Sequence, residues 1–369
     1  MMKVLFTTNI PSPYRVDFFN ELGKKIDLTV LFENEIATDR ENMWQLGEFN
    51  FFKSVFMKGF YVKSSGKICP EILRYVSNKE FDVIIIGMYS TPTSMIAIQY
   101  MKIKKIPFII SSDGGMIRED SKINNIIKKY FIGSASAWLS SGNKTTEYLC
   151  HYGAIKDNTY IYPFTSIKEN EVLKKKLTYD EKKTQKNKLC IKEENVIISV
   201  GQFINRKGFD ILIKACSNID NKIGVYIIGG EPTEEYIHLV NELNITNVHF
   251  IGFKLKSDLI NYYMAADLFV LPTREDIWGL VINEAMAYGL PVITTKYCVA
   301  GMEMVVMNKN GWITEVDSIE ISNLINYFFT KCNQSEMSEE ALKTARQYTI
   351  EKMAISHYES ILDFYRCIR

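Results

Sequence analysis

The sequence lacks the features that mark several large protein classes. Its 369 residues include no apolar run near the roughly 20 residues that span a bilayer. The seven cysteines are scattered singly without a Cys-x-x-Cys pair, which is typical of reduced thiols and argues against a disulfide framework or zinc ribbon. The net charge of +1 provides no basic field for nucleic acid. We therefore expect a cytoplasmic protein whose membrane contact, if any, is peripheral.

Groups that bind metals or act as activated nucleophiles are also sparse. The four histidines are dispersed, and no Asp-x-Asp occurs. No metal site is predicted, and a Ser-His-Asp or Cys-His mechanism has no support in the sequence. The N-terminus carries one lysine and a short apolar run before Pro11 and Pro13, so it is expected to form a buried first strand and not a signal peptide.

Short apolar runs alternate with longer helical patterns along both halves of the chain. The run Phe81–Ile86 is apolar at every position except Asp82, as in a strand that is covered on both faces. Strands that alternate with helices form parallel sheets through right-handed crossovers. At roughly 150 residues per domain the length allows about two domains. The sequence therefore predicts an α/β protein of two doubly wound, Rossmann-like domains.

A change in composition suggests where the two domains meet. Residues 167–192 are rich in lysine and glutamate and poor in apolar residues. We predict a first domain at residues 1–165, a second at 166–345, and a C-terminal helix at 346–369 that returns to the first. The basic run is able to touch anionic lipid, but its interleaved acids favour a solvated helix face.

The segment Leu271–Thr295 carries the most chemical information. A buried strand ends at Pro272, a polar loop follows, and a helix begins near Gly279. Ligands of open α/β sheets bind where strands end and helices begin. The first free N–H groups of such a helix, together with its dipole, suit a phosphate.

Two carboxylates bracket this predicted phosphate site. Asp276 lies in the loop, and Glu284 lies within an otherwise apolar helix. A buried carboxylate without a partner costs several kcal/mol. Glu284 should therefore have polar company, either sugar or ribose hydroxyls or a lysine or arginine from the other half of the chain.

The segment D-I-W-G-L-V-I-N-E-A-M-A-Y-G-L-P-V resembles the donor-site signature of GT-B glycosyltransferases, in particular the retaining family 4 with its glycogen synthase-like C-terminal half. By this resemblance Glu284 holds the ribose of a nucleotide sugar and Asp276, with Glu275, contacts the donor sugar. Two departures stand out. The first acid is Asp276 instead of Glu, and Trp278 replaces the usual Phe.

The resemblance extends over most of the C-terminal half. Residues 200–214, V-G-Q-F-I-N-R-K-G-F-D-I-L-I-K, are similar to the stretch with the family's phosphate-binding lysine, which falls on Lys207. Gln202 replaces the family's arginine, and Arg206 is the nearby candidate to compensate for the lost charge. Taken alone, Arg206 and Lys207 would be a surface pair. The donor site implied by the resemblance comprises Gln202, Arg206, Lys207, Gly229, Gly230, Phe253, Glu275, Asp276, Ile277, Trp278, Gly279, Leu280, Val281 and Glu284.

The N-terminal half resembles the family less, because its first loop lacks the usual glycines. Pro13 and Arg15 lie in and after that loop, and Tyr89 follows another strand, which predicts an acceptor-side surface. Arg15 is either a phosphate ligand or a helix-start arginine. Asp113 is placed where the family has a catalytic-site histidine, but it also suits an Asp-Gly turn.

The resemblance implies a retaining glycosyltransferase that moves a hexose-type sugar from a nucleotide diphosphate sugar, UDP-sugar favoured, to a glycan acceptor of cell-surface polysaccharide (capsule, O-antigen or exopolysaccharide), without a metal or other cofactor. Its catalytic residues would be Lys207, Asp276, Glu284 and Asp113. A lipid-linked acceptor at the inner membrane face would bring peripheral membrane contact, for which the helix Ile123–Phe131 beside Lys128 and Lys129 is the candidate, although its apolar residues are expected to face the core. The alternatives are a nucleotide-sugar epimerase and a non-catalytic subunit of the same fold.

Overall fold

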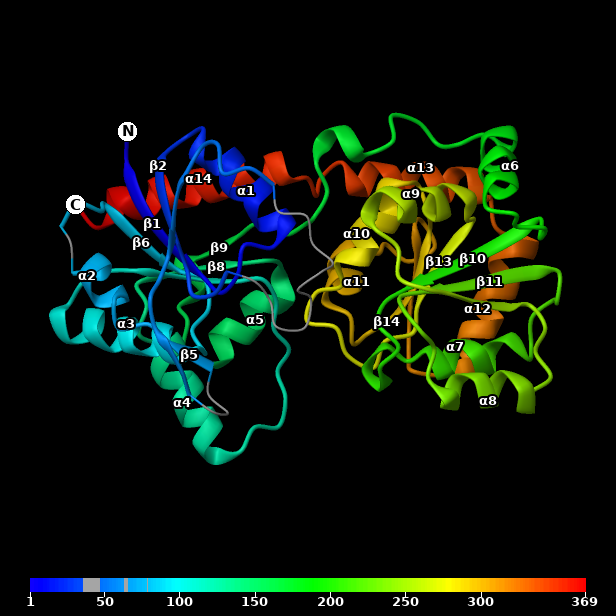
Figure 1. Ribbon diagram of the computed structural model, residues 1–369, viewed down its shortest axis with the longest axis horizontal. Coiled ribbons are helices and arrows are strands. Elements are labelled where there is room, and N and C mark those ends of the chain that lie inside the picture. Colours follow the sequence, from blue (N-terminus) through cyan, green and yellow to red (C-terminus); the bar gives the residue numbers. More distant parts are fainter. Residues whose placement is uncertain (36–46, 63–65, 78) are drawn as a thin grey trace. The chain divides into compact units, whose positions relative to one another are not determined.

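The computed structural model describes residues 1–35, 47–62, 66–77 and 79–369. The chain forms two compact units. Unit 1 contains Met1–Ser166 and Thr349–Arg369, and unit 2 contains Ile167–Tyr348. Each unit has a parallel sheet with helices against it (Figure 1). The predicted class of an α/β protein with two Rossmann-like sheets is therefore confirmed.

The sheet of unit 1 has seven parallel strands in the order β3-β2-β1-β6-β7-β8-β9. They are β1 (Lys3–Thr8), β2 (Asp27–Phe32), β3 (Lys53–Phe56), β6 (Val83–Ile86), β7 (Ile109–Ser112), β8 (Ala137–Ser140) and β9 (Thr159–Ile161). A separate antiparallel ribbon joins β4 (Phe60–Val62) to β5 (Gly66–Ile68). Strand β1 pairs with β2 on one side and β6 on the other, so the winding of the chain reverses there. Ligands of such sheets bind near this reversal.

Helices of unit 1 cover its sheet and come from both ends of the chain. They are α1 (Pro13–Gly23), α2 (Ile72–Val76), α3 (Pro92–Lys104), α4 (Lys122–Ile132), α5 (Asn143–His151) and the C-terminal α14 (Ile350–Cys367), with a 3-10 turn η1 (Lys156–Asn158). Figure 1 shows α14 beside α1, and the two helices are in contact. The ring of Phe18 on α1 lies 4.6 Å from that of His357 on α14. The last residues of the chain thus complete the core of the first unit.

The sheet of unit 2 has six parallel strands in the order β12-β11-β10-β13-β14-β15. They are β10 (Asn195–Val200), β11 (Ile223–Ile228), β12 (Val248–Ile251), β13 (Leu268–Leu271), β14 (Val292–Thr295) and β15 (Gly311–Thr314). The winding reverses between β10 and β13, where Ile197 lies opposite Leu268. The segments that follow these two strands carry most of the predicted donor residues.

The helices of unit 2 form two layers on its sheet. Figure 1 places α7 (Phe209–Cys216), α8 (Glu234–Glu242) and α12 (Ser318–Lys331) together, apart from α6 (Tyr179–Lys188), α9 (Lys256–Ala265), α10 (Leu280–Ala287) and α13 (Gln334–Ala345). The contacts of α7 with α8 and α12, of α6 with α9, and of α10 with α13 agree with this grouping. The short α11 (Val299–Met304) follows β14, and 3-10 turns are η2 (Glu169–Glu171) and η3 (Asn205–Lys207).

The charged stretch at the start of unit 2 forms α6. Thr178 caps this helix together with Glu181 in a reciprocal capping box. Most of its side chains face solvent, as favoured from the interleaved charges. Lys182 and Lys186 are exceptions, because both reach the carboxylate of Asp267, at 2.8 and 3.0 Å. These ion pairs fasten the helix to the start of β13.

Helix α4 contradicts one expectation. Its apolar residues were predicted to face the core, but Ile123 is 70% exposed and Ile126 is 67% exposed. Helical periodicity correctly indicates an apolar stripe, yet it does not say what the stripe faces. Among the described residues, no helix combines the length and apolar character that crossing a bilayer requires.

Candidate functional site

The first loop of the site follows β10 and is shaped by glycine. Gly208 has φ +70°, and a Cβ built on it would lie 2.0 Å from the carbonyl oxygen of Pro272. No side chain fits there, so the loop lies against the end of β13. The turn η3 then presents Arg206 at the surface and Lys207 in a buried position. A close approach of two backbones therefore determines where the two cations lie.

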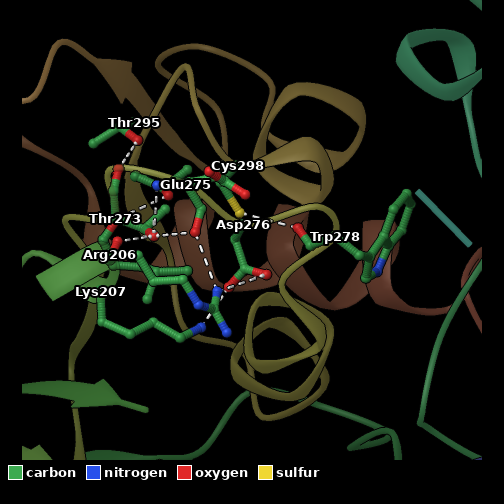
Figure 2. A network of polar contacts seen from close by, with 10 residues as sticks. Arg206, Lys207, Thr273, Glu275, Asp276, Trp278, Thr295 and Cys298 are labelled. Atoms are coloured by element: carbon green, nitrogen blue, oxygen red, sulfur yellow. Dashed lines mark hydrogen bonds and ion pairs between the residues drawn. The ribbon is translucent and has the colours of Figure 1, made fainter. Parts of the chain in front are cut away.

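A set of hydrogen bonds joins three loops at the carboxyl edge of the sheet. The hydroxyl of Thr273 donates to the carbonyl of Arg206 at 2.8 Å, and the backbone N–H of Arg274 donates to the same oxygen at 2.8 Å. The hydroxyl of Thr295, at the end of β14, donates to the carbonyl of Thr273 at 2.5 Å. Figure 2 shows this network. The loops after β10, β13 and β14 are thus held as one assembly.

Asp276 is the acidic centre of this assembly. Its backbone N–H donates to the carbonyl of Tyr297 at 2.8 Å, and its carbonyl accepts from the N–H of Val299 at 3.1 Å. Its buried carboxylate lies 2.5 Å from Nζ of Lys207 and 3.9 Å from Nη1 of Arg206. In Figure 2 both cationic side chains point toward this carboxylate. The structure therefore brings Arg206, Lys207 and Asp276 together.

The N-terminus of α10 follows directly. Its N-cap, Gly279, has φ +103°, and a Cβ there would lie 2.7 Å from Sγ of Cys298. No side-chain hydrogen bond caps the helix at this residue. The first N–H groups of any helix have no intrahelical acceptor, so those at Leu280 and Val281 suit an anion.

The residues between Asp276 and Gly279 differ in exposure. Ile277 is exposed, whereas Trp278 is buried and its indole N–H donates to Oδ1 of Asn283 at 2.9 Å. The Trp278 ring points away from the cations in Figure 2 and lies 6.5 Å from the ring of Tyr348. Its side chain therefore packs under the loop, and only its backbone remains available to a ligand on the side of the cations.

Glu284 is half-buried on α10. The hydroxyl of Tyr263, on α9, donates to Oε2 of Glu284 at 3.0 Å. Burial and the nearby Glu284 carboxylate raise the pKa of Tyr263 well above its ordinary value, so the phenol stays a neutral donor. Tyr288 stacks on the Tyr263 ring at 5.7 Å. The expectation of polar company for Glu284 is met by a residue that the sequence analysis did not single out.

The remaining predicted donor residues lie around these loops. Gly229 follows β11, and a Cβ there would lie 1.7 Å from the carbonyl oxygen of Gly201, so only glycine fits. Gly230 has φ +136° and open space around its Cβ position. Gln202 and Phe253 are exposed, and Glu275 is partly exposed. All of these residues belong to unit 2.

Unit 1 contains its own polar cluster, near the carboxyl ends of β1, β7 and β9. Arg15, in the first turn of α1, forms an ion pair with Asp113. The hydroxyl of Tyr162 contacts the other carboxylate oxygen of Asp113 at 2.8 Å. Burial, the largest single influence, lowers the pKa of Arg15, but the Asp113 carboxylate together with Tyr14 and Tyr162 outweighs it, and the net shift is upward. Arg15 is thus a buried, permanently charged partner of Asp113 and not a surface arginine.

Further residues of unit 1 surround this cluster. The imidazole of His357 is fully buried, 4.2 Å from the ring of Tyr162, and burial lowers its pKa to about 3. Buried atoms without a hydrogen-bond partner include Nη1 of Arg15 and Nε2 of His357. Of the other predicted acceptor-side residues, Pro13 begins α1, and the hydroxyl of Tyr89 bonds to that of Tyr148. Tyr162 and His357 carry no sequence signal of this role, since a buried aromatic and a packed histidine are ordinary core residues.

No group of three or more His, Cys, Asp or Glu side chains within the described part of the chain could hold a metal ion. The site chemistry that the structure does describe is cationic and amide-based in unit 2, with a carboxylate between the cations.

Comparison with known proteins finds similarity over the segment that contains these loops. The model of the family described as glycosyl transferases group 1 matches residues 180–347, which include every residue of the unit 2 site. An uncharacterized glycosyltransferase of Haemophilus influenzae is 33% identical over 187 residues, 48% of this chain and 51% of that protein. The lipopolysaccharide glucosyltransferase WaaG of Escherichia coli is 31% identical over 111 residues, 29% of each chain. The chain thus spans about half or less of the length of these curated relatives.

A solved structure shares the architecture over nearly the whole chain. The crystal structure of Anabaena Alr3699/HepE in complex with UDP aligns with a TM-score of 0.78 at 18% identity, over 98% of this chain and 100% of that one. At this identity the likeness shows the fold alone, which is the fold of two Rossmann-like sheets described above.

Proposed function

We propose that this protein is a retaining glycosyltransferase that moves a hexose-type sugar from a nucleoside diphosphate sugar, UDP-sugar favoured, to a glycan acceptor in cell-surface polysaccharide synthesis. The observation that carries the proposal is the convergence of Lys207, Arg206 and Asp276 at the strand reversal between β10 and β13, within the segment matched by the family. The UDP complex of the Anabaena protein supports the choice of nucleotide.

The proposed chemistry centres on the departing diphosphate. When the bond between the anomeric carbon and the diphosphate oxygen breaks, that oxygen gains negative charge. Lys207 and Arg206 would stabilise it, because cations aimed at developing charge lower the barrier. In the structure Lys207 lies against Asp276. Donor binding would exchange this partner for phosphate and turn the Asp276 carboxylate, with Glu275, toward the sugar hydroxyls.

The other proposed contacts position the donor. The N–H groups around Gly279 and Leu280 would bind the diphosphate at the start of α10, and Glu284 would accept hydrogen bonds from the ribose hydroxyls. The acceptor oxygen then bonds to the anomeric carbon on the face that the diphosphate leaves, and its proton passes to the leaving oxygen. In unit 1, Asp113 would orient a sugar or acceptor hydroxyl. It would do so through the lone pairs of its carboxylate oxygens that are not used in the bonds to Arg15 and Tyr162.

The proposed setting is the cytoplasmic side of a membrane, with peripheral contact to a lipid-linked acceptor. WaaG, named as a lipopolysaccharide glucosyltransferase, supports an acceptor of this kind. No metal is required by this proposal, since the cations of the site are lysine and arginine.

Thermal stabilisation by a panel of nucleotides and nucleotide sugars tests the proposal. Binding raises the melting temperature by an amount that grows with the logarithm of the ligand concentration over Kd, so at equal concentrations the cognate donor should give the largest shift. Product analysis with the best donor alone should show slow hydrolysis and no epimer, and transfer should appear when glycan acceptors are added, also in the presence of a chelator. An epimerised sugar, or the absence of any nucleotide-dependent stabilisation, would contradict the proposal.

A further inference from the structure

Helix α4 turns its apolar stripe away from the protein. The exposed residues are spaced i, i+3, i+4 and i+7, which places them on one face of a helix: Ile123, Ile126, Ile127 and Tyr130. The end of the helix is fixed by Ile132, which is fully buried. A surface helix of a globular domain ordinarily faces the core with such a stripe. The reversed orientation of α4 therefore needs a partner outside the unit.

The anchoring of α4 is polar and explains how this orientation is held. Lys128 bonds to both carboxylate oxygens of Asp120, at 2.9 and 2.8 Å, and the Tyr152 hydroxyl donates to the same carboxylate. These contacts lie on the side of α4 that faces its own unit. The bonds of Asp120 with Lys128 and Tyr152 thus hold the helix with its isoleucines exposed to solvent.

Cations surround the exposed stripe. Lys122 and Lys129 are exposed and lie about two turns apart on the flank beside Ile126, by the helical spacing of 100° per residue. The neighbouring end of α3 adds an exposed apolar residue, Ile103, and more cations. Its Lys102 Nζ lies 3.6 Å from the Tyr130 ring centre. Figure 1 shows α3 and α4 next to each other.

The charge around the stripe is almost entirely of one sign. Helix α4 contains no acidic residue, and the end of α3 contributes Lys102, Lys104 and Lys105, all exposed. Of the two acids that precede α4, Asp120 is neutralised by Lys128 and Glu119 is exposed. An apolar stripe flanked by lysines is complementary to a surface that offers acyl chains below a layer of negative headgroups.

We propose that α4, with the end of α3, docks this protein on an anionic lipid bilayer. The isoleucines enter the boundary between headgroups and acyl chains, and the lysines contact the headgroup phosphates. The inference rests on the proposed function for its purpose, because a lipid-linked acceptor would be met at that surface. The binding itself is measured without any sugar.

Vesicle sedimentation of the full chain tests the proposal. The protein should bind mixed vesicles that contain equal amounts of phosphatidylglycerol and phosphatidylcholine. It should bind vesicles of phosphatidylcholine alone much less, and salt should weaken binding to the mixed vesicles. The double variant Ile123→Ser/Ile126→Ser should lose binding by at least about tenfold. The double variant Lys122→Gln/Lys129→Gln should lose roughly tenfold on anionic vesicles.

A matched control removes exposed isoleucines elsewhere. Ile319 on α12 is 62% exposed and Ile237 on α8 is 45% exposed, both in unit 2. The variant Ile319→Ser/Ile237→Ser should bind vesicles like the wild type. All variants should keep the thermal stabilisation by UDP or UDP-sugar, which separates this proposal from the donor-site assignment. The proposal is overturned if anionic vesicles do not sediment the protein, if the control loses as much binding as the α4 variants, or if the stripe proves to be a contact between two copies, seen as a dimer that Ile123→Ser/Ile126→Ser abolishes.

Discussion

The two units each place a cation against a carboxylate near the carboxyl ends of their strands, but they build the pair differently. In unit 2 the pair is Lys207 with Asp276, held by backbone hydrogen bonds and by glycines that allow close approach. In unit 1 the pair is Arg15 with Asp113, enclosed by Tyr162 and by α14. The first arrangement fixes the backbone and leaves the side chains to exchange partners. The second fixes the side chains themselves.

Because of this difference, we expect the unit 2 pair to take part in the reaction and the unit 1 pair to stabilise the fold. Lysine is a compact charge on a flexible stem, whereas arginine binds a carboxylate in a fixed planar geometry. A ligand phosphate is therefore able to displace Asp276 from Lys207 more readily than it could displace Asp113 from Arg15. Substitutions in the two pairs should separate these roles.

The largest effect is expected for Lys207→Met. Losing the charge that faces the departing diphosphate should lower kcat by roughly 100- to 1,000-fold, measured as sugar transfer to acceptor. Since the single variant leaves the buried Asp276 without its closest cation, the double variant Lys207→Met/Asp276→Asn is the control for folding. It should recover thermal stability and stay inactive. If this double variant recovered activity together with thermal stability, Lys207 would serve only to stabilise the folded state.

Arg15→Met should act mainly on stability. The variant leaves Asp113 partly buried without its ion-pair partner, which should lower the free energy of unfolding by about 3 kcal/mol in urea titrations. The UDP-dependent rise in melting temperature should persist, because the residues proposed to bind the nucleotide belong to unit 2. Adding Asp113→Asn should restore much of the loss. If Arg15→Met abolishes nucleotide binding at full stability, the contrast between the two pairs is wrong.

Glu284→Ala should lower kcat/KM by at least about 100-fold with the fold intact, because a ribose that is no longer held lets the reacting atoms move out of line. Tyr263→Phe is the matched control, since it keeps the carboxylate and removes only the hydroxyl that donates to it. That variant should lose roughly tenfold or less. Equal losses would assign the effect to the hydrogen bond between the two side chains instead of to contact with donor.

The smallest effect concerns His357 and pH. Its folded pKa of about 3 lies below the ordinary 6.5, so as the pH falls through 6.5 the unfolded chain binds a proton that the folded chain does not. Stability therefore declines toward acid, by up to about 1.4 kcal/mol per pH unit between 6.5 and 3 from this group. His357→Gln removes that loss. When the pH is lowered from 7.5 to 5.0, the free energy of unfolding of the wild type should fall by about 2 kcal/mol more than that of the variant. Parallel pH profiles would show that the buried His357 does not have the lowered pKa.

The sequence predicted unit 2 better than unit 1, for physical reasons. Apolar runs followed by a glycine mark β10 and β11, and Gly208 directly precedes α7. The loop around Asp276 could be predicted because its glycines, proline and acids are local signals. Strands β3, β9 and β15 were not predicted, since each mixes polar residues or glycine with few apolar ones and so lacks a continuous apolar run.

Polar contacts between residues far apart in the chain could not be predicted from the sequence. Nothing local to Tyr263 shows that its hydroxyl meets Glu284, and nothing local to Tyr162 shows that it meets Asp113. The outward orientation of Ile123 and Ile126 depends on the bonds that Asp120 makes with Lys128 and Tyr152. These are contacts between residues that only the folded chain brings together.

The return of α14 to unit 1 has a consequence for how the protein is made. Unit 2 is continuous, from Ile167 to Tyr348, and its residues have all been synthesised before the last helix emerges. Unit 1 begins first but must wait, with Phe18 and its neighbours on α1 uncovered, until the final 18-residue helix leaves the ribosome. The half that starts first therefore finishes last. A chain stopped at Tyr348 should keep a cooperative unfolding transition for its second half while its first half binds chaperones.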